Sequence, residues 1–209
     1  MKSVTLSLLA WALLLVAPVN AQELEIGAKA PMADAPMLNV DGTQMTLNGL
    51  QGEQGLLVVF SCNTCPFVVG NGTKTEGWEG RYNGLHSLAQ SLGFGMVLVN
   101  SNEAKREGDD SFSAMKNHAR DAEYTMAYVV DEESKLANAM GARVTPHVYL
   151  FDGDLTLVYR GAIDDNVNRA DEVKETYLAD AMNRLASGKS IKEAETKALG
   201  CSIKRVATN

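Results

Sequence analysis

The chain has 209 residues, with 19 Lys and Arg against 26 Asp and Glu, which gives a net charge of −7 at pH 7. This acidic balance argues against nucleic acid or an anionic membrane surface as a partner. The length fits one domain with a sizeable core, and the sequence shows no repeat, low-complexity tract or linker that would divide it.

Residues 1–21 are predicted to be a signal peptide rather than part of the fold. Lys2 supplies a charged start, and residues 8–16 form an apolar stretch that is too short to span a bilayer. Val19 and Ala21 place small side chains where a cleavage site needs them. We therefore expect a protein exported to the periplasm or secreted, with no membrane insertion once the signal is removed. A buried N-terminal helix or a membrane anchor is the alternative interpretation.

Residues 22–209 are predicted to form a single α/β domain. The turn signal Asp41-Gly42 predicts a hairpin over residues 37–47. Apolar runs predict strands at residues 56–60, 96–99, 127–130, 148–151 and 155–159. Helical spacing predicts helices at residues 81–92, after Asp110, at 135–140 and at 171–186. Four glycines are expected to interrupt any helix that begins near residue 66, namely Gly70, Gly72, Gly77 and Gly80.

Two cysteines follow the first of these apolar strands. Cys62 and Cys65 are separated by two residues, and the next residue, Pro66, is favoured at the first position of a helix because its missing N–H costs nothing there. The spacing predicts Cys65 at a helix N-terminus, where free N–H groups and the helix dipole stabilise a thiolate. This arrangement favours thiol–disulfide exchange. An inert structural disulfide is the alternative, whereas three cysteines and scattered histidines do not show the spacing of a zinc site.

A third cysteine, Cys201, lies in the C-terminal tail, so an odd number of thiols would enter an oxidising compartment. One interpretation is a buried core thiol, flanked by Leu199 and Ile203. The other is a third exchange thiol within disulfide reach of Cys62 or Cys65. That interpretation requires Cα atoms no more than about 7 Å apart.

Several motifs resemble the peroxiredoxin-like redoxin branch of the thioredoxin superfamily. Residues 62–68 (CNTCPFV) look like the motif of that family, and residues 200–204 (GCSIK) look like its C-terminal signature. Shorter matches are Asn100-Ser101-Asn102, Asp110-Ser111, Met115-Lys116, Asp131-Glu132 and the run VYRG at residues 158–161. The resemblance covers residues 22–205. It implies an α/β thioredoxin-like fold, with a central mixed sheet flanked by helices and an N-terminal β-hairpin extension.

The same resemblance implies a role for Thr145-Pro146. Base rates favour a trans bond for an isolated Pro, but in this fold a cis X–Pro turn faces the dithiol and pairs with an extended substrate. Thr145 and Pro146 are therefore expected to position the substrate. His147, which follows, is interpreted either as a packed strand residue or as a base or soft-metal ligand near the cysteines.

The sequence leaves two possible nucleophiles. In thioredoxins the attacking cysteine follows the last aromatic residue of the strand at a characteristic spacing. The same spacing from Phe60 leads to Cys65 here, and the position of Cys65 near the helix start also favours it as the nucleophile. The usual order within a CxxC motif instead favours Cys62. Peroxiredoxins carry a Pro and a Thr ahead of their peroxidatic cysteine. Those positions hold other residues here, Gly55 and Val59 ahead of Cys62, or Val58 and Cys62 ahead of Cys65.

The leading hypothesis is an exported thiol–disulfide oxidoreductase with Cys65 and Cys62 as its catalytic residues. Its expected partners are a protein disulfide or thiol substrate and a thiol redox partner. No organic cofactor is expected, because the sequence has neither a dinucleotide fingerprint nor a phosphate loop. The alternatives are a thiol peroxidase and a Cu(I)-handling protein with Cys62, Cys65 and His147 as ligands.

Overall fold

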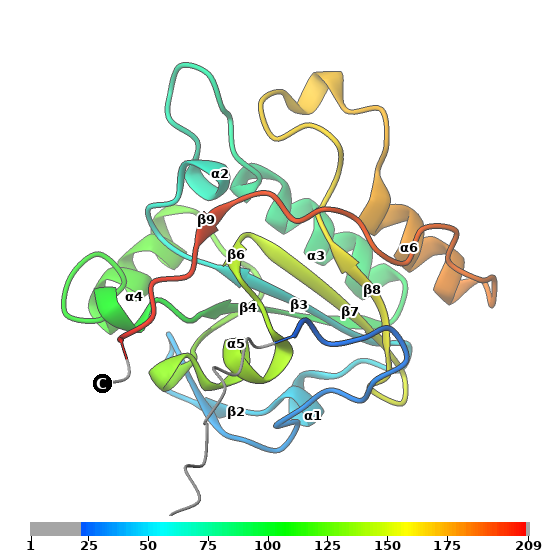
Figure 1. Cartoon of the computed structure of the whole chain (residues 1–209), viewed down its shortest axis with the longest axis horizontal. Helices are drawn as coiled ribbons and strands as arrows, with labels where there is room; N and C mark the ends of the chain where they lie inside the picture. Colours follow the sequence, from blue (N-terminus) through cyan, green and yellow to red (C-terminus); the bar gives the residue numbers. More distant parts are fainter. Residues whose placement is uncertain (1–21, 208–209) are drawn as a thin grey trace, which may run out of the picture.

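The computed structural model describes residues 22–207, and its centre is a mixed sheet of seven strands (Figure 1). The predicted signal peptide, residues 1–21, lies outside the described residues. From edge to edge the strand order is β2-β1-β5-β4-β3-β7-β8. These strands are β1 (Met37–Asn39), β2 (Gln44–Met45), β3 (Gly55–Ser61), β4 (Phe94–Asn100), β5 (Ala127–Val130), β7 (His147–Asp152) and β8 (Leu157–Gly161). A second sheet pairs β6 (Val144–Thr145) with β9 (Cys201–Ser202).

The pairing confirms the expected mixed sheet and its N-terminal hairpin. Strands β3, β4 and β5 run parallel, whereas β7 is antiparallel to β3 and β8 is antiparallel to β7. The predicted hairpin is β1–β2, and it joins the sheet through an antiparallel pairing of β1 with β5. Because parallel strands end at the same edge, the residues that follow β3 and β4 lie near one another.

Helices cover both faces of the sheet. They are α1 (Leu47–Leu50), α2 (Pro66–Val69), α3 (Tyr82–Ser91), α4 (Phe112–Asp121), α5 (Lys135–Met140) and α6 (Tyr177–Ala186). Short 3₁₀ turns are η1 (Glu79–Arg81), η2 (Glu103–Lys105), η3 (Glu132–Ser134) and η4 (Ala170–Glu172). Among residues 22–207, no helix is long and apolar enough to cross a membrane.

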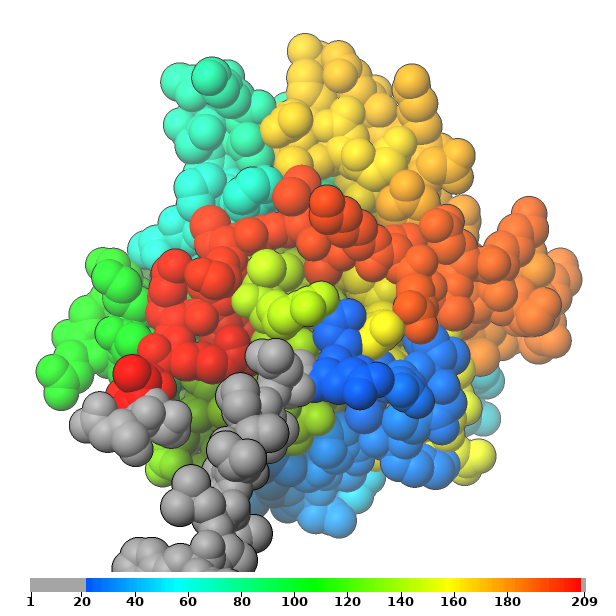
Figure 2. Space-filling model, in the orientation of Figure 1, coloured from blue at the N-terminus to red at the C-terminus, as the bar shows by residue number. Residues whose placement is uncertain are grey.

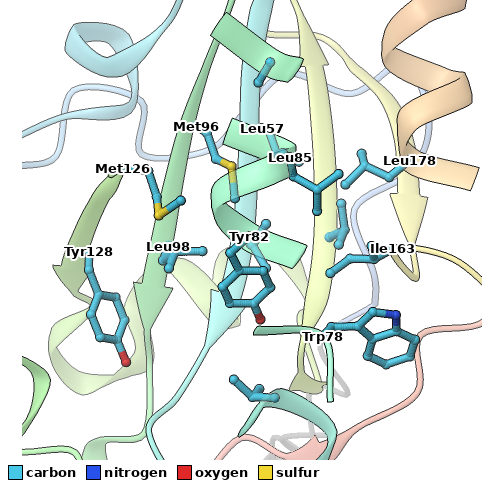
Figure 3. Close-up of a cluster of buried hydrophobic side chains, with 14 of the residues drawn as sticks. Leu57, Trp78, Tyr82, Leu85, Met96, Leu98, Met126, Tyr128, Ile163 and Leu178 are labelled. Carbon is cyan, nitrogen blue, oxygen red and sulfur yellow. The ribbon is translucent and has the colours of Figure 1, made fainter. Parts of the chain in front are cut away.

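Alternating side chains of the strands divide the core into two clusters. One cluster packs the sheet against α2, α3, α4 and α6, and Figure 3 shows its large side chains, among them Trp78, Tyr82 and Leu178. Cys62 and Cys65 belong to this cluster. The other cluster packs the opposite face against α1 and α5. All seven residues of β3 are buried because both faces of this central strand are covered.

The last helix is shorter than predicted. α6 begins at Tyr177 rather than near residue 171. Val173, which fits the helical spacing, has an extended backbone with φ of −63° and ψ of 130°. The Lys174 N–H is instead hydrogen-bonded to Asp165 Oδ1 at 3.0 Å. The apolar period therefore extends upstream of the helix start, into a segment that hydrogen bonds to a neighbouring loop hold in a non-helical conformation.

The last strand of the sheet also begins later than predicted. β8 starts at Leu157, not at residue 155. Leu155 has a positive φ of 52° and donates its N–H to the Asp152 carbonyl oxygen at 2.9 Å, so it belongs to the turn before the strand. A buried, apolar turn residue has the same composition signal as a strand residue, which is why the boundary was misplaced.

Candidate active site

The end of β3 and the start of α2 hold the first two cysteines. Cys62 follows β3 directly, and Cys65 is the N-cap of α2, with an extended backbone and Pro66 in the first turn. The Cys65 carbonyl oxygen accepts hydrogen bonds from the N–H groups of Val68 and Val69, at 2.8 and 2.9 Å. The predicted placement of Cys65 at the start of a helix is confirmed.

Thr145 lies against both sulfurs. The Thr145-Pro146 peptide bond is cis, as expected. Cys62 Sγ lies 3.2 Å from Thr145 Oγ1, and the Cys65 thiol donates a hydrogen bond to the Thr145 carbonyl oxygen at 3.1 Å. The expectation that this turn borders the dithiol is therefore confirmed.

The tail brings the third cysteine to the same place. In the pairing of β6 with β9, Cys201 is directly opposite Thr145. The side chain of Cys201 interacts with that of Cys65, and each changes the pKa of the other. All three cysteines are free thiols, and Cys201 is half-buried rather than enclosed in the core. The interpretation of Cys201 as a core thiol holds in part, because its side chain packs against the core cluster without being fully buried, and the structure brings Cys62, Cys65 and Cys201 into one cluster.

Hydrogen bonds from the other two thiols make Cys65 acidic. The hydrogen bond from Cys62 is the largest influence. With hydrogen bonds from Cys201, and against the effect of burial, it lowers the pKa of Cys65 to about 5. The Thr145 carbonyl favours the protonated thiol and so limits this effect. The hydrogen bond to Cys65, followed by burial, raises the pKa of Cys62 far above its usual value. Burial and the contact with Cys65 raise the pKa of Cys201 to about 11.

The helix dipole contributes less to this acidity than the sequence suggested. α2 has only four residues and ends at Gly70, which has a φ of 79°. A Cβ on Gly70 would lie 2.5 Å from the Glu76 carbonyl oxygen, so the backbone there has no room for a side chain. The macrodipole sums over aligned peptide units, and one turn supplies few of them. The contacts with Cys62 and Cys201 take the place of the predicted dipole.

A buried carboxylate holds the loop between the two cysteines. Asp110 is fully buried, and its Oδ1 accepts hydrogen bonds from Asn63 N at 2.9 Å and from Asn100 Nδ2 at 2.7 Å. Its Oδ2 accepts a hydrogen bond from Asn102 Nδ2 at 2.9 Å. Tyr128 Oη donates to Asn63 Oδ1 at 2.9 Å. These contacts fix Asn63, and with it the path of the chain from Cys62 to Cys65.

Sequence reasoning gave no role to this network. In the sequence, Asn100 and Asn102 stand out only as part of a motif that resembles the redoxin family. The signal that identifies them is positional, because Asn100 ends β4 and Asn102 follows it, and β4 runs parallel to β3 and ends at the same edge. The negative charge of Asp110 also adds to the raised pKa of Cys62, after the larger effects of the Cys65 contact and burial. The network therefore favours Cys65, not Cys62, as the ionised cysteine.

His147 lies on the other side of the sheet from the cysteines. Its ring packs on Tyr149 with centroids 4.7 Å apart, and Tyr149 belongs to the opposite core cluster. Burial lowers the pKa of His147 to about 3, so it is neutral at physiological pH. Among residues 22–207, no group of three or more His, Cys, Asp or Glu is arranged to hold a metal ion. Cys62, Cys65 and His147 therefore do not form the ligand set that the copper alternative requires, and the interpretation of His147 as a packed strand residue is confirmed.

Comparison with known proteins agrees with this geometry. The family model described as Redoxin matches residues 25–177. The chain belongs to the Redoxin family. Membership supports a thiol-dependent redox enzyme, either an oxidoreductase or a peroxidase. No curated protein matches this redoxin.

Solved structures similar to this redoxin extend over most of its length. One is an uncharacterized conserved protein from Geobacillus kaustophilus, with 30% identity and a TM-score of 0.77, covering 88% of this chain and 94% of that one. A hypothetical protein from Sinorhizobium meliloti 1021 has 26% identity and a TM-score of 0.78, covering 90% and 98%. Peroxiredoxin Q from Xanthomonas campestris, at 19% identity and a TM-score of 0.53 over 78% and 96%, shows the shared fold.

Labelling of the reduced protein should separate its thiols by pH. Iodoacetamide is expected to modify Cys65 at about pH 6, because only Cys65 is ionised there, and its rate should fall as the pH drops through about 5. Cys62 and Cys201 should react only at alkaline pH. Peptide mass spectrometry identifies the modified residue, and the urea-unfolded protein serves as the control in which all three react alike. Preferential modification of Cys62 would contradict the assignment.

Removal of the buried carboxylate should loosen the cysteine loop. Asp110→Ala leaves three hydrogen-bond donors without their acceptor, which should lower the free energy of unfolding by about 3–5 kcal/mol in urea titrations. Asp110→Asn keeps one acceptor oxygen and should cost less. The exposed neighbour Asp109 provides a matched control, and Asp109→Ala should change stability by no more than about 0.5 kcal/mol. Equal losses for Asp109→Ala and Asp110→Ala would show that the network does not hold the loop.

Proposed function

We propose that this redoxin is a thiol–disulfide oxidoreductase in which Cys65 attacks and Cys62 resolves. The observation that carries the proposal is the contact between the two sulfurs. The interaction with the Cys62 thiol lowers the pKa of Cys65 and so favours its thiolate form. An ionised sulfur in contact with a second, protonated sulfur is the arrangement that thiol–disulfide exchange uses.

In the proposed reaction, the Cys65 thiolate attacks one sulfur of a substrate disulfide, R–S–S–R′. A Cys65–S–R bond forms as the substrate S–S bond breaks, and R′–S⁻ leaves with the electron pair and takes up the proton of Cys62. The Cys62 thiolate then attacks Cys65 Sγ, and R–S⁻ leaves. The substrate is reduced to two thiols, and the enzyme dithiol is oxidised to a Cys62–Cys65 disulfide. The reverse steps oxidise a substrate dithiol.

Thr145 and Pro146 are proposed to position the substrate. The carbonyl oxygen of Thr145 is 3.1 Å from Cys65 Sγ, and the Thr145 backbone belongs to a short strand that pairs with another chain segment. β9 of the tail occupies this edge in the structure, so an extended peptide would pair with Thr145 after displacing β9 and would then bring its own cysteine to Cys65. A protein or peptide disulfide, or the corresponding dithiol, is therefore the proposed substrate class.

Paired substitutions test this assignment. With a model peptide that contains one disulfide, Cys65→Ser should reduce turnover to background because the attacking sulfur is lost. Cys62→Ser combined with Cys201→Ser, in which neither neighbouring thiol can displace the peptide, should lower turnover by at least about tenfold and accumulate a mixed disulfide between Cys65 and the peptide, visible as an added mass. The two variants are matched controls for each other. Full turnover by Cys65→Ser, or a mixed disulfide on Cys62, would contradict the proposal.

A thiol peroxidase is the second candidate function. The acidic Cys65 supports it, because the thiolate is the form that peroxide oxidises to sulfenic acid. Stopped-flow oxidation of the reduced protein by hydrogen peroxide distinguishes the two. Oxidation as slow as that of free cysteine supports the disulfide reaction, whereas fast oxidation with multiple peroxide turnovers favours the peroxidase.

Export from the cytoplasm forms part of the proposal, supported by the charged start and short apolar stretch of residues 1–21. Expression of the full sequence in a Gram-negative host should give a periplasmic protein whose first residue is Gln22. N-terminal sequencing of the fractionated protein checks this, and a Lys2→Glu variant with impaired export serves as the control. An uncleaved cytoplasmic protein would remove the oxidising compartment from the proposal.

A further inference from the structure

The segment after α6 returns across the molecule and covers the dithiol. We call residues 194–205 the C-terminal strap, and Figure 2 shows it as the red band that crosses the surface. At its upstream end, the Thr196 N–H donates to the Arg160 carbonyl oxygen at 3.0 Å. At its downstream end, the N–H of the buried Ile203 donates to the Arg143 carbonyl oxygen at 2.9 Å. The strap is therefore held on both sides of Cys201.

Strand pairing sets the position of Cys201 between these two ends. Cys201 is opposite Thr145, and the Thr145 carbonyl oxygen is the contact of Cys65 Sγ. Gly200 makes the close approach possible, because a Cβ there would lie 2.3 Å from the same carbonyl oxygen. A shift of one residue in this register would turn a different side chain toward Cys65. The pairing therefore delivers the sulfur of residue 201, and no other, to Cys65.

Cys62 and Cys201 both interact with Cys65. Cys62 is hydrogen-bonded to the Thr145 hydroxyl and interacts with Cys65, and Cys201 interacts with Cys65 from the strap. Exposure rises along this series, because Cys62 is 2% exposed, Cys65 is 4% exposed and Cys201 is half-buried. The sulfur of a large protein partner reaches the last of these more readily than the first two.

We propose that Cys201 is a relay thiol, which transfers the disulfide of the buried Cys62/Cys65 pair to the surface, where a dithiol protein reduces it. The relay rests on the proposed function, because that reaction supplies the Cys62–Cys65 disulfide. It adds a third exchange residue and assigns the partner to the class of dithiol proteins.

The transfer within the protein is a disulfide exchange, and the partner dithiol then supplies the two electrons that reduce the site. Cys201 gives its proton to solvent, and its thiolate attacks Cys65 Sγ. The Cys65–Cys201 bond forms, the Cys62–Cys65 bond breaks, and Cys62 leaves with the electron pair and takes up a proton. A thiolate of the partner dithiol then attacks Cys201 Sγ, and Cys65 leaves as a thiolate. The second partner thiol displaces Cys201, so the partner ends as a disulfide and all three cysteines are reduced.

The pKa values of Cys65 and Cys201 agree with attack of the partner at Cys201 in the second step. Exchange is faster when the sulfur that leaves is the more acidic one. Hydrogen bonds, above all from Cys62, lower the pKa of Cys65 to about 5, whereas burial raises the pKa of Cys201 to about 11. A partner that attacks the more exposed Cys201 therefore expels the better leaving group.

Non-reducing peptide mapping tests the bond itself. Trypsin releases Cys65 in the peptide of residues 30–74 and Cys201 in the peptide of residues 198–204. A Cys62→Ser protein treated with oxidised glutathione should yield these two peptides joined by a disulfide. Adding Gly200→Ala should lower the yield severalfold, because the new Cβ meets the Thr145 backbone. Gly84→Ala, whose Cβ would have nothing within 4 Å, is the matched control and should leave the yield unchanged.

Reduction kinetics test the relay. The oxidised wild-type and Cys201→Ser proteins are mixed with reduced thioredoxin or with dithiothreitol. Cys201→Ser should slow reduction by thioredoxin by at least about tenfold and change reduction by dithiothreitol by less than about twofold, because only the large partner needs the exposed sulfur. A purely structural role for Cys201 would alter both rates alike.

The outcomes separate the relay from the function on which it rests. The joined peptides together with the selective loss of thioredoxin reduction support the relay. Absence of the Cys65–Cys201 link, or an unchanged thioredoxin rate in Cys201→Ser, overturns the relay and leaves the Cys62/Cys65 reaction standing. Turnover that survives Cys65→Ser overturns the proposed function and the relay together.

Discussion

The contacts of Thr145 determine the geometry of the whole site. Its hydroxyl lies against Cys62, its carbonyl oxygen accepts a hydrogen bond from Cys65, and its backbone pairs with Cys201. Three segments that are far apart in the sequence therefore meet at one buried residue. The motif loop, the turn before β7 and the tail each depend on it, since a shift of Thr145 would change the distance of every sulfur from the others.

The sulfurs that lower the pKa of Cys65 are also the ones that can resolve its disulfides. Burial by itself disfavours a thiolate and would raise the pKa of a cysteine in the core. The hydrogen bond from Cys62, supported by Cys201, reverses this for Cys65. Both donors are sulfurs that can also bond to Cys65 covalently. A disulfide between Cys65 and one of these sulfurs leaves the other as a thiol, so only the fully reduced site has both donors.

Local patterns predicted most of the fold but not the contacts that complete the site. The strand at 127–130 and the helix at 135–140 were predicted at their observed bounds, because each has a clear apolar period between turn signals. Cys65 at a helix start and the cis Thr145-Pro146 bond also follow from the motif and the fold. The β6–β9 pairing was not predicted, because two-residue strands have no period and their register depends on residues far apart in the chain. The role of Asp110 was missed for the same reason, since its partners come from the end of β4 and from the loops that follow β3 and β4.

The two close glycine contacts connect the tail to the chemistry of the sheet edge. The Cβ of any residue other than glycine at position 200 would meet the Thr145 carbonyl, and one at position 161 would lie 2.1 Å from Thr196 Oγ1. The absence of a side chain at each glycine therefore allows the strap to pack closely against a neighbouring strand. A tail needed only to cover an apolar surface would not have to approach the backbone this closely, because side chains bridge such gaps. Backbone contact is required where the register matters, and here the register determines which side chain faces Cys65.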